Sequence, residues 1–254
     1  MAEYFPSMPV DGKQLVFTRK AELFNEDFYQ SDLDSNKSWT KSKSLAGKLN
    51  TPLSEGAMHI SQDGEILVFT GCLRPDTYGS CDLYVSFKTE NGWSEAENLG
   101  PTINSGQWDS QPCLSPDKKD LYFASRRLGG YGGSDIYVSH LMDNGYWTTP
   151  ENLGPTINSP EDEQCPFMHA DNQTLFFTSS YWTGYGDEDI FYAKKELNGT
   201  WTKPVNLGYP INTIDREGTL FIAADGKTAY YASERSDSYG GLDLYTFQLR
   251  KDIR

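Results

Sequence analysis

Short runs of apolar and aromatic residues recur along the whole chain, and each is followed by polar or glycine-rich sequence. Nearly continuous apolar runs of this length are typical of strands that are packed on both faces. Asp-Gly, Asp-Asn and Asn-Gly pairs beside the runs favour tight hairpin turns. No segment has a convincing helical period, so we expect an all-β protein. The most regular runs are 15–18, 67–70, 121–124, 175–178 and 229–232.

The runs belong to a repeat of 54 residues. Its clearest copy, 109–154, contains four candidate strands, which predicts a four-stranded antiparallel sheet. Repeats of this length indicate propellers or solenoids, and a closed ring of sheets buries both faces of each and removes most exposed edges. The period is carried by tryptophans, asparagines and leucines: Trp39, Trp93, Trp147 and Trp201; Asn50, Asn104, Asn158 and Asn212; Leu45, Leu99, Leu153 and Leu207.

The sequence therefore predicts one five-bladed β-propeller with four-stranded antiparallel blades at about 3–52, 53–106, 107–160, 161–214 and 215–254. A linear β-solenoid is the alternative, but its repeats are usually much shorter. The fifth copy reaches Arg254 before its tryptophan. Either that last blade is incomplete, with three strands, or the natural chain continues; we favour continuation, as expected of a domain excised from a longer multidomain envelope protein.

Charge and cysteine content narrow the function classes. The net charge of −14 disfavours nucleic acid phosphates and anionic lipid surfaces as partners, and no apolar run approaches the length of a membrane span. Cys72 and Cys81 flank one loop between neighbouring strands, which favours a disulfide and an oxidising compartment over two free thiols. Without a CxxC or His/Cys cluster, we expect no metal and no cofactor.

Each copy carries an acidic residue where its innermost strand begins. Converging carboxylates repel one another, so these residues are expected to form an acidic ring at the channel mouth that something neutralises. Four copies also carry an arginine at one repeat position. We favour structural arginines that bridge acids between blades; a cation or basic ligand in the mouth is the alternative. The acids are Glu3, Glu55, Asp109, Glu163 and Glu217, and the arginines are Arg19, Arg74, Arg127 and Arg235.

Glycine-rich loops between the second and third strands supply candidate ligand-binding residues. Their tyrosines either cap the packing between blades, which we favour, or surround a binding funnel. Phosphate binding is disfavoured because no P-loop lysine follows. Blade four departs from the repeat, and an asymmetric ligand would use such departures first. The candidate funnel residues are Tyr78, Tyr131, Tyr185 and Tyr239, with Tyr181, Trp182, Asp187 and Glu188 from blade four.

Residues 115–139, SPDKKDLYFASRRLGGYGGSDIYVS, with the tryptophan and NLG-x-x-IN-S sequence that follow, resemble the TolB-type, WD-repeat-like periplasmic propeller repeat. More narrowly, GCLRPDTYGSCDLYVS at 71–86 and NLGYPINT at 206–213 resemble the propeller of PorE-like, OmpA-family lipoproteins of the Bacteroidetes type IX secretion system. This resemblance implies a periplasmic, outer-membrane-associated scaffold that binds envelope proteins or peptides and catalyses nothing. It implies no direct membrane insertion, and contact with peptidoglycan only through a flanking domain.

Two further functions remain as alternatives. A lectin-like propeller would bind carbohydrate through exposed aromatic side chains. A five-bladed glycoside hydrolase would need two carboxylates in a deep pocket, but most acids here are explained by repeat position, and Glu161, Asp187 and Glu188 are the exceptions. The three histidines occupy unrelated repeat positions and form no triad. We therefore expect protein binding without catalysis.

Overall fold

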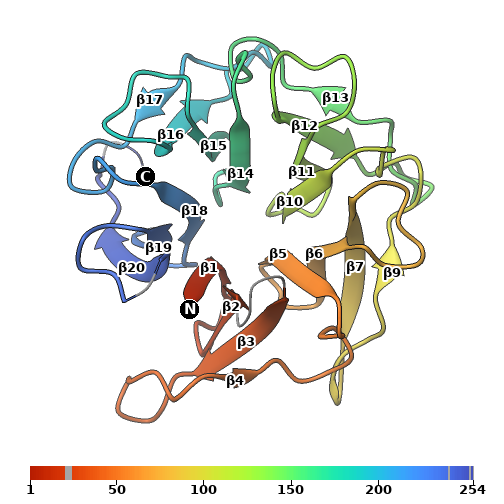
Figure 1. The fold of residues 1–254 in the computed structure, drawn as a ribbon, viewed down its shortest axis with the longest axis vertical. Coiled ribbons are helices and arrows are strands. Elements are labelled where there is room, and N and C mark those ends of the chain that lie inside the picture. Colours follow the sequence, from red (N-terminus) through yellow and green to blue (C-terminus); the bar gives the residue numbers. More distant parts are fainter. Residues whose placement is uncertain (21–24, 240, 252, 254) are drawn as a thin grey trace.

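The structure is a computed structural model that describes residues 1–20, 25–239, 241–251 and 253. It contains five antiparallel sheets arranged as blades around a central channel (Figure 1). In each blade the first strand lies innermost, and the following strands run outward in chain order. The predicted all-β, five-bladed propeller is therefore confirmed.

The first four blades are complete, and the last has three strands among the described residues. Blade one contains β1 (Ala2–Ser7), β2 (Gln14–Lys20), β3 (Glu26–Asp32) and β4 (Lys43–Ser44). Blade two contains β5 (Ser54–Ile60), β6 (Ile66–Cys72), β7 (Cys81–Thr89), β9 (Glu97–Asn98) and an extra strand, β8 (Gly92–Trp93). Blade three contains β10 (Asp109–Leu114), β11 (Asp120–Ser125), β12 (Asp135–His140) and β13 (Glu151–Asn152). Blade four contains β14 (Glu163–Met168), β15 (Thr174–Ser179), β16 (Asp189–Lys194) and β17 (Val205–Asn206), and blade five β18 (Glu217–Ile222), β19 (Thr228–Ser233) and β20 (Asp243–Gln248).

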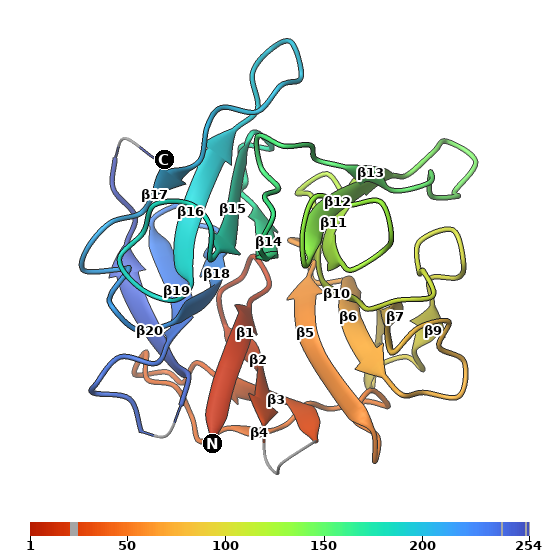
Figure 2. The same cartoon turned by 45° about the horizontal axis from the view of Figure 1, so that its top comes forward.

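The antiparallel order gives the ring two different faces (Figure 2). The loops between second and third strands, and the links between blades, lie on the face where the innermost strands begin. We call this the loop face. The tight hairpins lie on the opposite face. The described residues include no helix long and apolar enough to cross a membrane.

Aromatic side chains fill the space between neighbouring blades. Phe28 of blade one meets Phe69 of blade two edge to face, with ring centroids 5.4 Å apart. Phe167 and Phe221 make the same kind of contact between blades four and five, at 5.6 Å. The second strands are buried on both sides, because each blade lies between two others. This explains why their sequences are apolar without alternation.

Equivalent backbone hydrogen bonds join successive blades and close the ring. Glu163 N–H donates to the Ser134 carbonyl at 2.8 Å, between blades three and four. Glu217 N–H donates to Glu188 at 2.9 Å, and Glu3 N–H donates to Leu242 at 2.7 Å. The last of these joins blade five to blade one. The ring therefore closes through the contact that also joins blades three, four and five, and in the described part of the chain no strand is shared between blades one and five.

A β-bulge interrupts every innermost strand, which the sequence analysis did not predict. Each bulge places a non-glycine residue in the left-handed region, a conformation that persists only where its surroundings fix it. Neighbouring blades provide this support: Cys165 N–H donates to Gln111 Oε1 at 2.8 Å, and Phe5 N–H to Thr219 Oγ1 at 3.1 Å. The φ angles are 51° for Phe5, 47° for Ala57, 59° for Gln111, 52° for Cys165 and 35° for Thr219.

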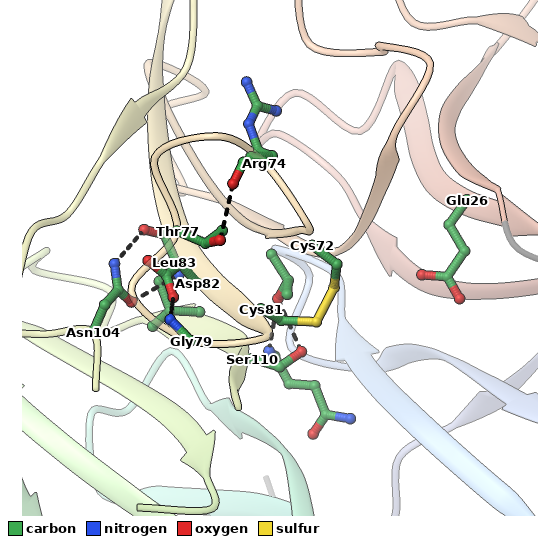
Figure 3. Close-up of a disulfide and its surroundings, with 12 residues drawn as sticks. Glu26, Cys72, Arg74, Thr77, Gly79, Cys81, Asp82, Leu83, Asn104 and Ser110 are labelled. Carbon is green, nitrogen blue, oxygen red and sulfur yellow. Dashed lines mark hydrogen bonds between the residues drawn. A yellow bond between two sulfur atoms is a disulfide. The ribbon is translucent and has the colours of Figure 1, made fainter. Parts of the chain in front are cut away.

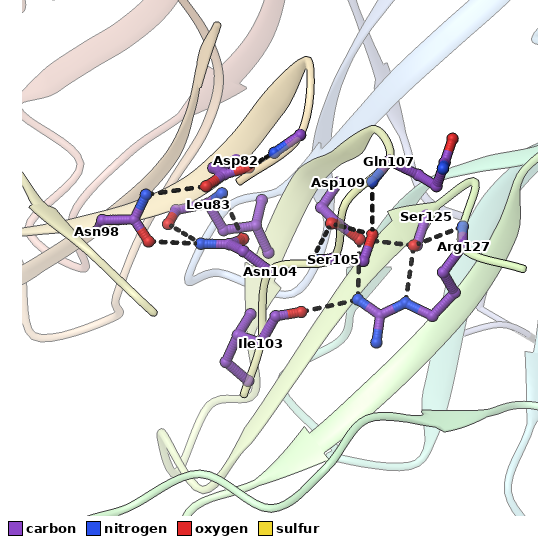
Figure 4. Close-up of polar contacts among 11 residues, drawn as sticks. Asp82, Leu83, Asn98, Ile103, Asn104, Ser105, Gln107, Asp109, Ser125 and Arg127 are labelled. Atoms are coloured by element: carbon purple, nitrogen blue, oxygen red, sulfur yellow. Dashed lines mark hydrogen bonds and ion pairs between the residues drawn. The ribbon is translucent and has the colours of Figure 1, made fainter. Parts of the chain in front are cut away.

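A side-chain network explains the repeated asparagines (Figure 4). In blade two, Asn104 accepts the Leu83 N–H at 2.8 Å and donates to the Leu83 carbonyl at 3.0 Å. Its amide also donates to Asn98 Oδ1 at 2.8 Å, and Asn98 donates to Asp82 at 2.9 Å. The network ties the fourth strand and the link to the third strand. It recurs in blades three and four.

Candidate functional site

The acidic residues that open the innermost strands of blades two to five fasten the links between blades and do not face the channel mouth. Asp109 accepts hydrogen bonds from the Ser105 N–H at 2.6 Å, from Ser125 Oγ at 2.6 Å and from Arg127 at 2.8 Å (Figure 4). Four of the five carboxylates are fully buried. Burial raises the pKa of Glu55, Glu163 and Glu217, and it outweighs the opposite effect of the hydroxyl and N–H groups that donate hydrogen bonds to these carboxylates. In place of the expected ring, the structure has four separate anchors, and the fifth acid, Glu3, pairs with Arg19 of its own blade. The anchors are Glu55, Asp109, Glu163 and Glu217.

The ion pairs of the arginines lie within one blade, whereas bridges between acids of different blades were expected. The contact of Arg127 and Arg235 with the preceding blade is a hydrogen bond to a backbone carbonyl of the link. Arg127 pairs with Asp109 of its own blade at 2.8 Å and lies over the Tyr137 ring, 4.8 Å from its centroid. Its guanidinium also donates to the Ile103 carbonyl, at 2.7 Å, in the link from the preceding blade. Arg19 pairs with Glu3, and Arg74 with Glu55, in the same way.

Blade four reaches the equivalent link carbonyl with a different donor, whereas blade five uses an arginine as blade three does. In blade four the Trp182 indole N–H donates to the Ile157 carbonyl at 3.2 Å. Trp182 therefore replaces the arginine as a structural donor, although the sequence analysis placed it in the funnel. In blade five Arg235 donates to the Ile211 carbonyl at 3.1 Å.

The glycine loops are held against the next blade, and their tyrosines project to solvent. Asp135 accepts the Tyr131 N–H at 2.6 Å. A Cβ atom on Gly132 would lie 2.3 Å from the Ser159 carbonyl oxygen, so only glycine fits there. The tyrosine side chains are at least half exposed, which disagrees with the packing role we favoured; they are Tyr78, Tyr131, Tyr181, Tyr185 and Tyr239. Asp187 is exposed on the same loop as Tyr185.

The channel opens on the loop face as a funnel of about 530 Å³. Its charged lining residues lie directly beside repeat positions: Arg216 beside an anchoring acid, Glu26 and Glu188 beside strand-opening aspartates, and Lys20 and Glu234 beside the repeated arginines. At these positions the backbone repeats but the side chains differ. This variation next to constant positions is the signal that could have identified the funnel from sequence. Apart from Glu188, the sequence analysis missed its charged and phenolic residues, which are Tyr4, Lys20, Glu26, Arg216 and Glu234.

Charges of both signs line this funnel. Arg216 Nε lies 2.8 Å from Glu188 Oε2. Burial opposes the charge on Arg216, but Glu188 outweighs burial and raises the pKa of the guanidinium. The Tyr4 hydroxyl donates to Glu26, and its pKa is raised by burial and by that carboxylate. The funnel can therefore offer ion pairs and hydrogen bonds to a polar ligand that lacks five-fold symmetry.

A disulfide lies in the funnel wall at blade two. Cys72 and Cys81, whose spacing favoured this bond, are joined with an S–S distance of 2.03 Å (Figure 3). Cys72 and Glu26, both drawn in Figure 3, line the same cavity. The described part of the chain has no group of three or more His, Cys, Asp or Glu residues placed to hold a metal ion.

Below the bulges the channel narrows to two small cavities of about 20 and 30 Å³. Phe167, Phe221 and His59 line both. His59 Nδ1 accepts the Leu114 N–H at 3.2 Å, and burial lowers the pKa of this imidazole to about 4. His59 is therefore a neutral packing residue, and the wider cavity of the channel lies on the loop face.

Comparisons with known proteins identify the fold. No family model and no curated protein matches the sequence. TolB from Acinetobacter baumannii is 16% identical, with a TM-score of 0.59 over 97% of this chain; the chain spans about half (51%) of that structure. An endo-arabinanase of family GH43 from Bacillus licheniformis is 13% identical, with a TM-score of 0.60, over 97% of this chain and 93% of the enzyme. An α-L-arabinofuranosidase from Lactobacillus brevis is 14% identical, with a TM-score of 0.63, over 99% and 92%.

These similarities support one expectation and overturn another. The similarity to TolB agrees with the TolB-type part of the sequence resemblance. From the repeat we expected that the chain is not an enzyme. That expectation is overturned, because three arabinanases and an α-L-arabinofuranosidase share this fold along at least 92% of their own length. At such low identity, what the chain shares with both groups is the propeller fold.

Proposed function

We propose that this propeller is a protein-binding module whose funnel and loop tyrosines receive a polar segment of a partner protein. The observation that carries the proposal is that constant and variable positions of the repeat have different roles. Constant positions build the ring, whereas the adjacent variable positions place Lys20, Glu26, Glu188, Arg216 and Glu234 in one cavity. In repeat proteins, variation concentrated on one face is typical of a binding surface.

The chemistry of the loop face suits a peptide. Tyrosine combines a large apolar ring with a hydroxyl and is enriched in protein interfaces. The exposed loop tyrosines lie on the same face as the funnel and its mixed charges. The net charge of −14 favours encounter with a basic partner segment.

The proposal includes a periplasmic, outer-membrane-associated location. The disulfide supports an oxidising compartment. The sequence resemblance to PorE-like, OmpA-family lipoproteins supports a place in a type IX secretion or peptidoglycan-associated complex. In that setting the propeller would bind envelope proteins or peptides, and peptidoglycan would be held by a flanking domain.

Photo-crosslinking in intact envelopes tests which face binds. A photoreactive phenylalanine analogue replaces either Tyr185, on the loop face, or Tyr146, which is also exposed but lies in a hairpin on the opposite face. We expect a discrete crosslinked protein from position 185 and none from position 146. Crosslinking from position 146 alone, or from neither position, contradicts the proposal.

Glycan binding with hydrolysis is the second candidate. The observation that favours it is that Glu26, Glu188 and Glu234, from three different blades, line one funnel. Glycoside hydrolases act with a pair of carboxylates around the scissile bond, and the arabinan-degrading enzymes above share this fold. Incubation with arabino-oligosaccharides tests it: turnover that Glu234→Gln abolishes, and that Glu95→Gln on the outer surface preserves, would support hydrolysis. Binding without turnover would indicate a lectin-like site, and absence of both would reject the candidate.

A further inference from the structure

Among the residues that the structure describes, blade five ends in an unpaired strand edge. In blades one to four, the third strand pairs with a short fourth strand; in blade three, Tyr137 pairs with Asn152 and Val138 with Glu151. The equivalent residues of β20 are Tyr245 and Thr246. Within the described residues, the sheet of blade five ends at β20.

The core of blade five is open at the same place. The residue after the strand-opening aspartate has no exposed surface in the four complete blades, where it is Phe28, Leu83, Ile136 or Ile190. Its counterpart Leu244 is partly exposed, and so is Tyr245, although the equivalent Tyr84 is fully buried. The fourth strand and its link therefore normally cover these side chains.

Polar groups in blade five lack the partners that the other blades provide. In blade three the Ile136 N–H donates to Asn158, the Ile136 carbonyl accepts the Leu153 N–H, and Asn152 donates to Asp135 at 2.8 Å. In the part of the chain that the structure describes, no hydrogen bond reaches the backbone of Leu244 from a link, and no asparagine reaches Asp243. The tyrosine N–H of the loop, from Tyr239, is the contact that Asp243 retains.

We propose that the β20 edge is a docking site for an extended segment with the chemistry of this protein's own fourth strand. Such a segment adds to the sheet as an antiparallel strand, the mode called β-augmentation. It carries one asparagine that donates to Asp243 and a second, six residues later, that binds the N–H and C=O of Leu244. This spacing separates Asn98 from Asn104 and Asn152 from Asn158.

The other blades also indicate which residues the docked segment needs between its two asparagines. A leucine follows the first asparagine. Its N–H donates to the carbonyl of the third-strand residue, as the Leu99 N–H donates to the Leu83 carbonyl at 3.0 Å. A glycine comes next, because this position has φ of +79° in Gly100, +81° in Gly154 and +77° in Gly208. The occupant is therefore a segment with the pattern Asn-Leu-Gly-x-x-x-Asn, preceded by a tryptophan. The site lies at the outer rim of the ring, away from the funnel.

A peptide from blade three tests the docking site. The acetylated and amidated peptide of residues 146–158, YWTTPENLGPTIN, carries a fluorophore at its N-terminus and is titrated with the 254-residue protein while anisotropy is measured. The control peptide replaces both asparagines with alanine. We expect saturable binding of one peptide per protein, weakened at least about tenfold in the control, because several hydrogen bonds are lost.

A variant of the protein locates the binding. In an antiparallel pair, hydrogen bonding alternates, so Tyr245 bonds to β19 and the Thr246 N–H points outward. Proline is tolerated where an edge strand faces solvent, so Thr246→Pro is expected to keep the wild-type circular dichroism spectrum and lose the peptide. Arg216→Ala, in the funnel, should bind the peptide normally, which separates this site from the proposed function.

Three outcomes would overturn the inference. The first is equal affinity for the two peptides, which would mean that the asparagine pattern is not read. The second is no binding of either peptide, or equal binding to the wild type and Thr246→Pro. The third is a dimer in analytical ultracentrifugation that Thr246→Pro dissociates, which would mean that a second copy of the chain covers the edge.

Discussion

Replacing Asn158 with alanine removes the side chain that joins the link of blade three to β12. Asn158 is 1% exposed and Ile136 is 0% exposed. The asparagine accepts the Ile136 N–H at 2.8 Å, donates to the Ile136 carbonyl at 2.9 Å and donates to Asn152 at 2.8 Å. The substitution breaks all three hydrogen bonds at once.

The expected loss in the free energy of unfolding depends on which polar groups keep a hydrogen-bond partner. The Ile136 carbonyl still accepts the Leu153 N–H at 3.1 Å, and Asn152 still accepts the Gly154 N–H at 2.9 Å. The buried Ile136 N–H is left unsatisfied, which costs about 1–3 kcal/mol, and each net hydrogen bond contributes about 1 kcal/mol. We therefore expect Asn158→Ala to lower the free energy of unfolding by about 3 kcal/mol, a large share of a typical stability of about 5–15 kcal/mol.

Urea denaturation followed by tryptophan fluorescence measures this loss. The matched control is Asn144→Ala, because Asn144 is exposed and its side chain caps a hairpin by accepting the Tyr146 N–H at 3.1 Å. The control should lose less than about 1 kcal/mol. Equal losses for the two variants, or a loss below about 0.5 kcal/mol for Asn158→Ala, would refute the role assigned to the repeated asparagines.

Three more predictions concern single features of the ring. Gly79→Ala should lower the melting temperature by several degrees because its Cβ would overlap the next link, whereas Gly106→Ala, with open space around it, should have little effect. Burial lowers the pKa of His59 to about 4, below its unfolded value of about 6.5, so its contribution to stability is complete above pH about 6.5 and is lost as the pH falls towards 4. The melting temperature of His59→Asn should therefore depend less on pH than that of the wild type across this interval, and parallel curves would contradict the assignment. Replacing Cys72 and Cys81 with serine should cost about 2–3 kcal/mol in urea denaturation, given the short loop that the disulfide closes, and no change would argue against that bond.

The fold could be predicted from sequence because each constant repeat position has one structural task in every blade. Asn104 and Asn158 bind the third strand in the same way, so their spacing reports a real structural period. The direction of the acidic side chains could not be predicted. Asp109 turns into its blade because the Ser105 N–H and Oγ, four residues earlier, bind it, and nothing in the spacing alone distinguishes this from an orientation towards the channel.

The funnel was not predicted because its residues do not repeat. Its residues occupy positions such as 26 and 216, which differ from copy to copy, and a search for constant positions passes over them. The bulges were also invisible, because they use residues as different as Phe5 and Gln111. Trp182 was assigned to the funnel as a departure from the repeat, but the departure preserves the arginine's hydrogen bond with a different donor.

The affinity of the protein recovered by crosslinking at position 185 tests the role of the funnel most directly. Binding to immobilised wild-type propeller is compared with binding to Glu234→Gln, which removes an anion from the funnel, and to Glu95→Gln, which removes one from the outer surface. The account predicts that Glu234→Gln weakens binding at least about tenfold, because a basic partner segment loses an opposite charge in the funnel, and that Glu95→Gln leaves binding unchanged. Equal affinity for all three proteins would contradict it.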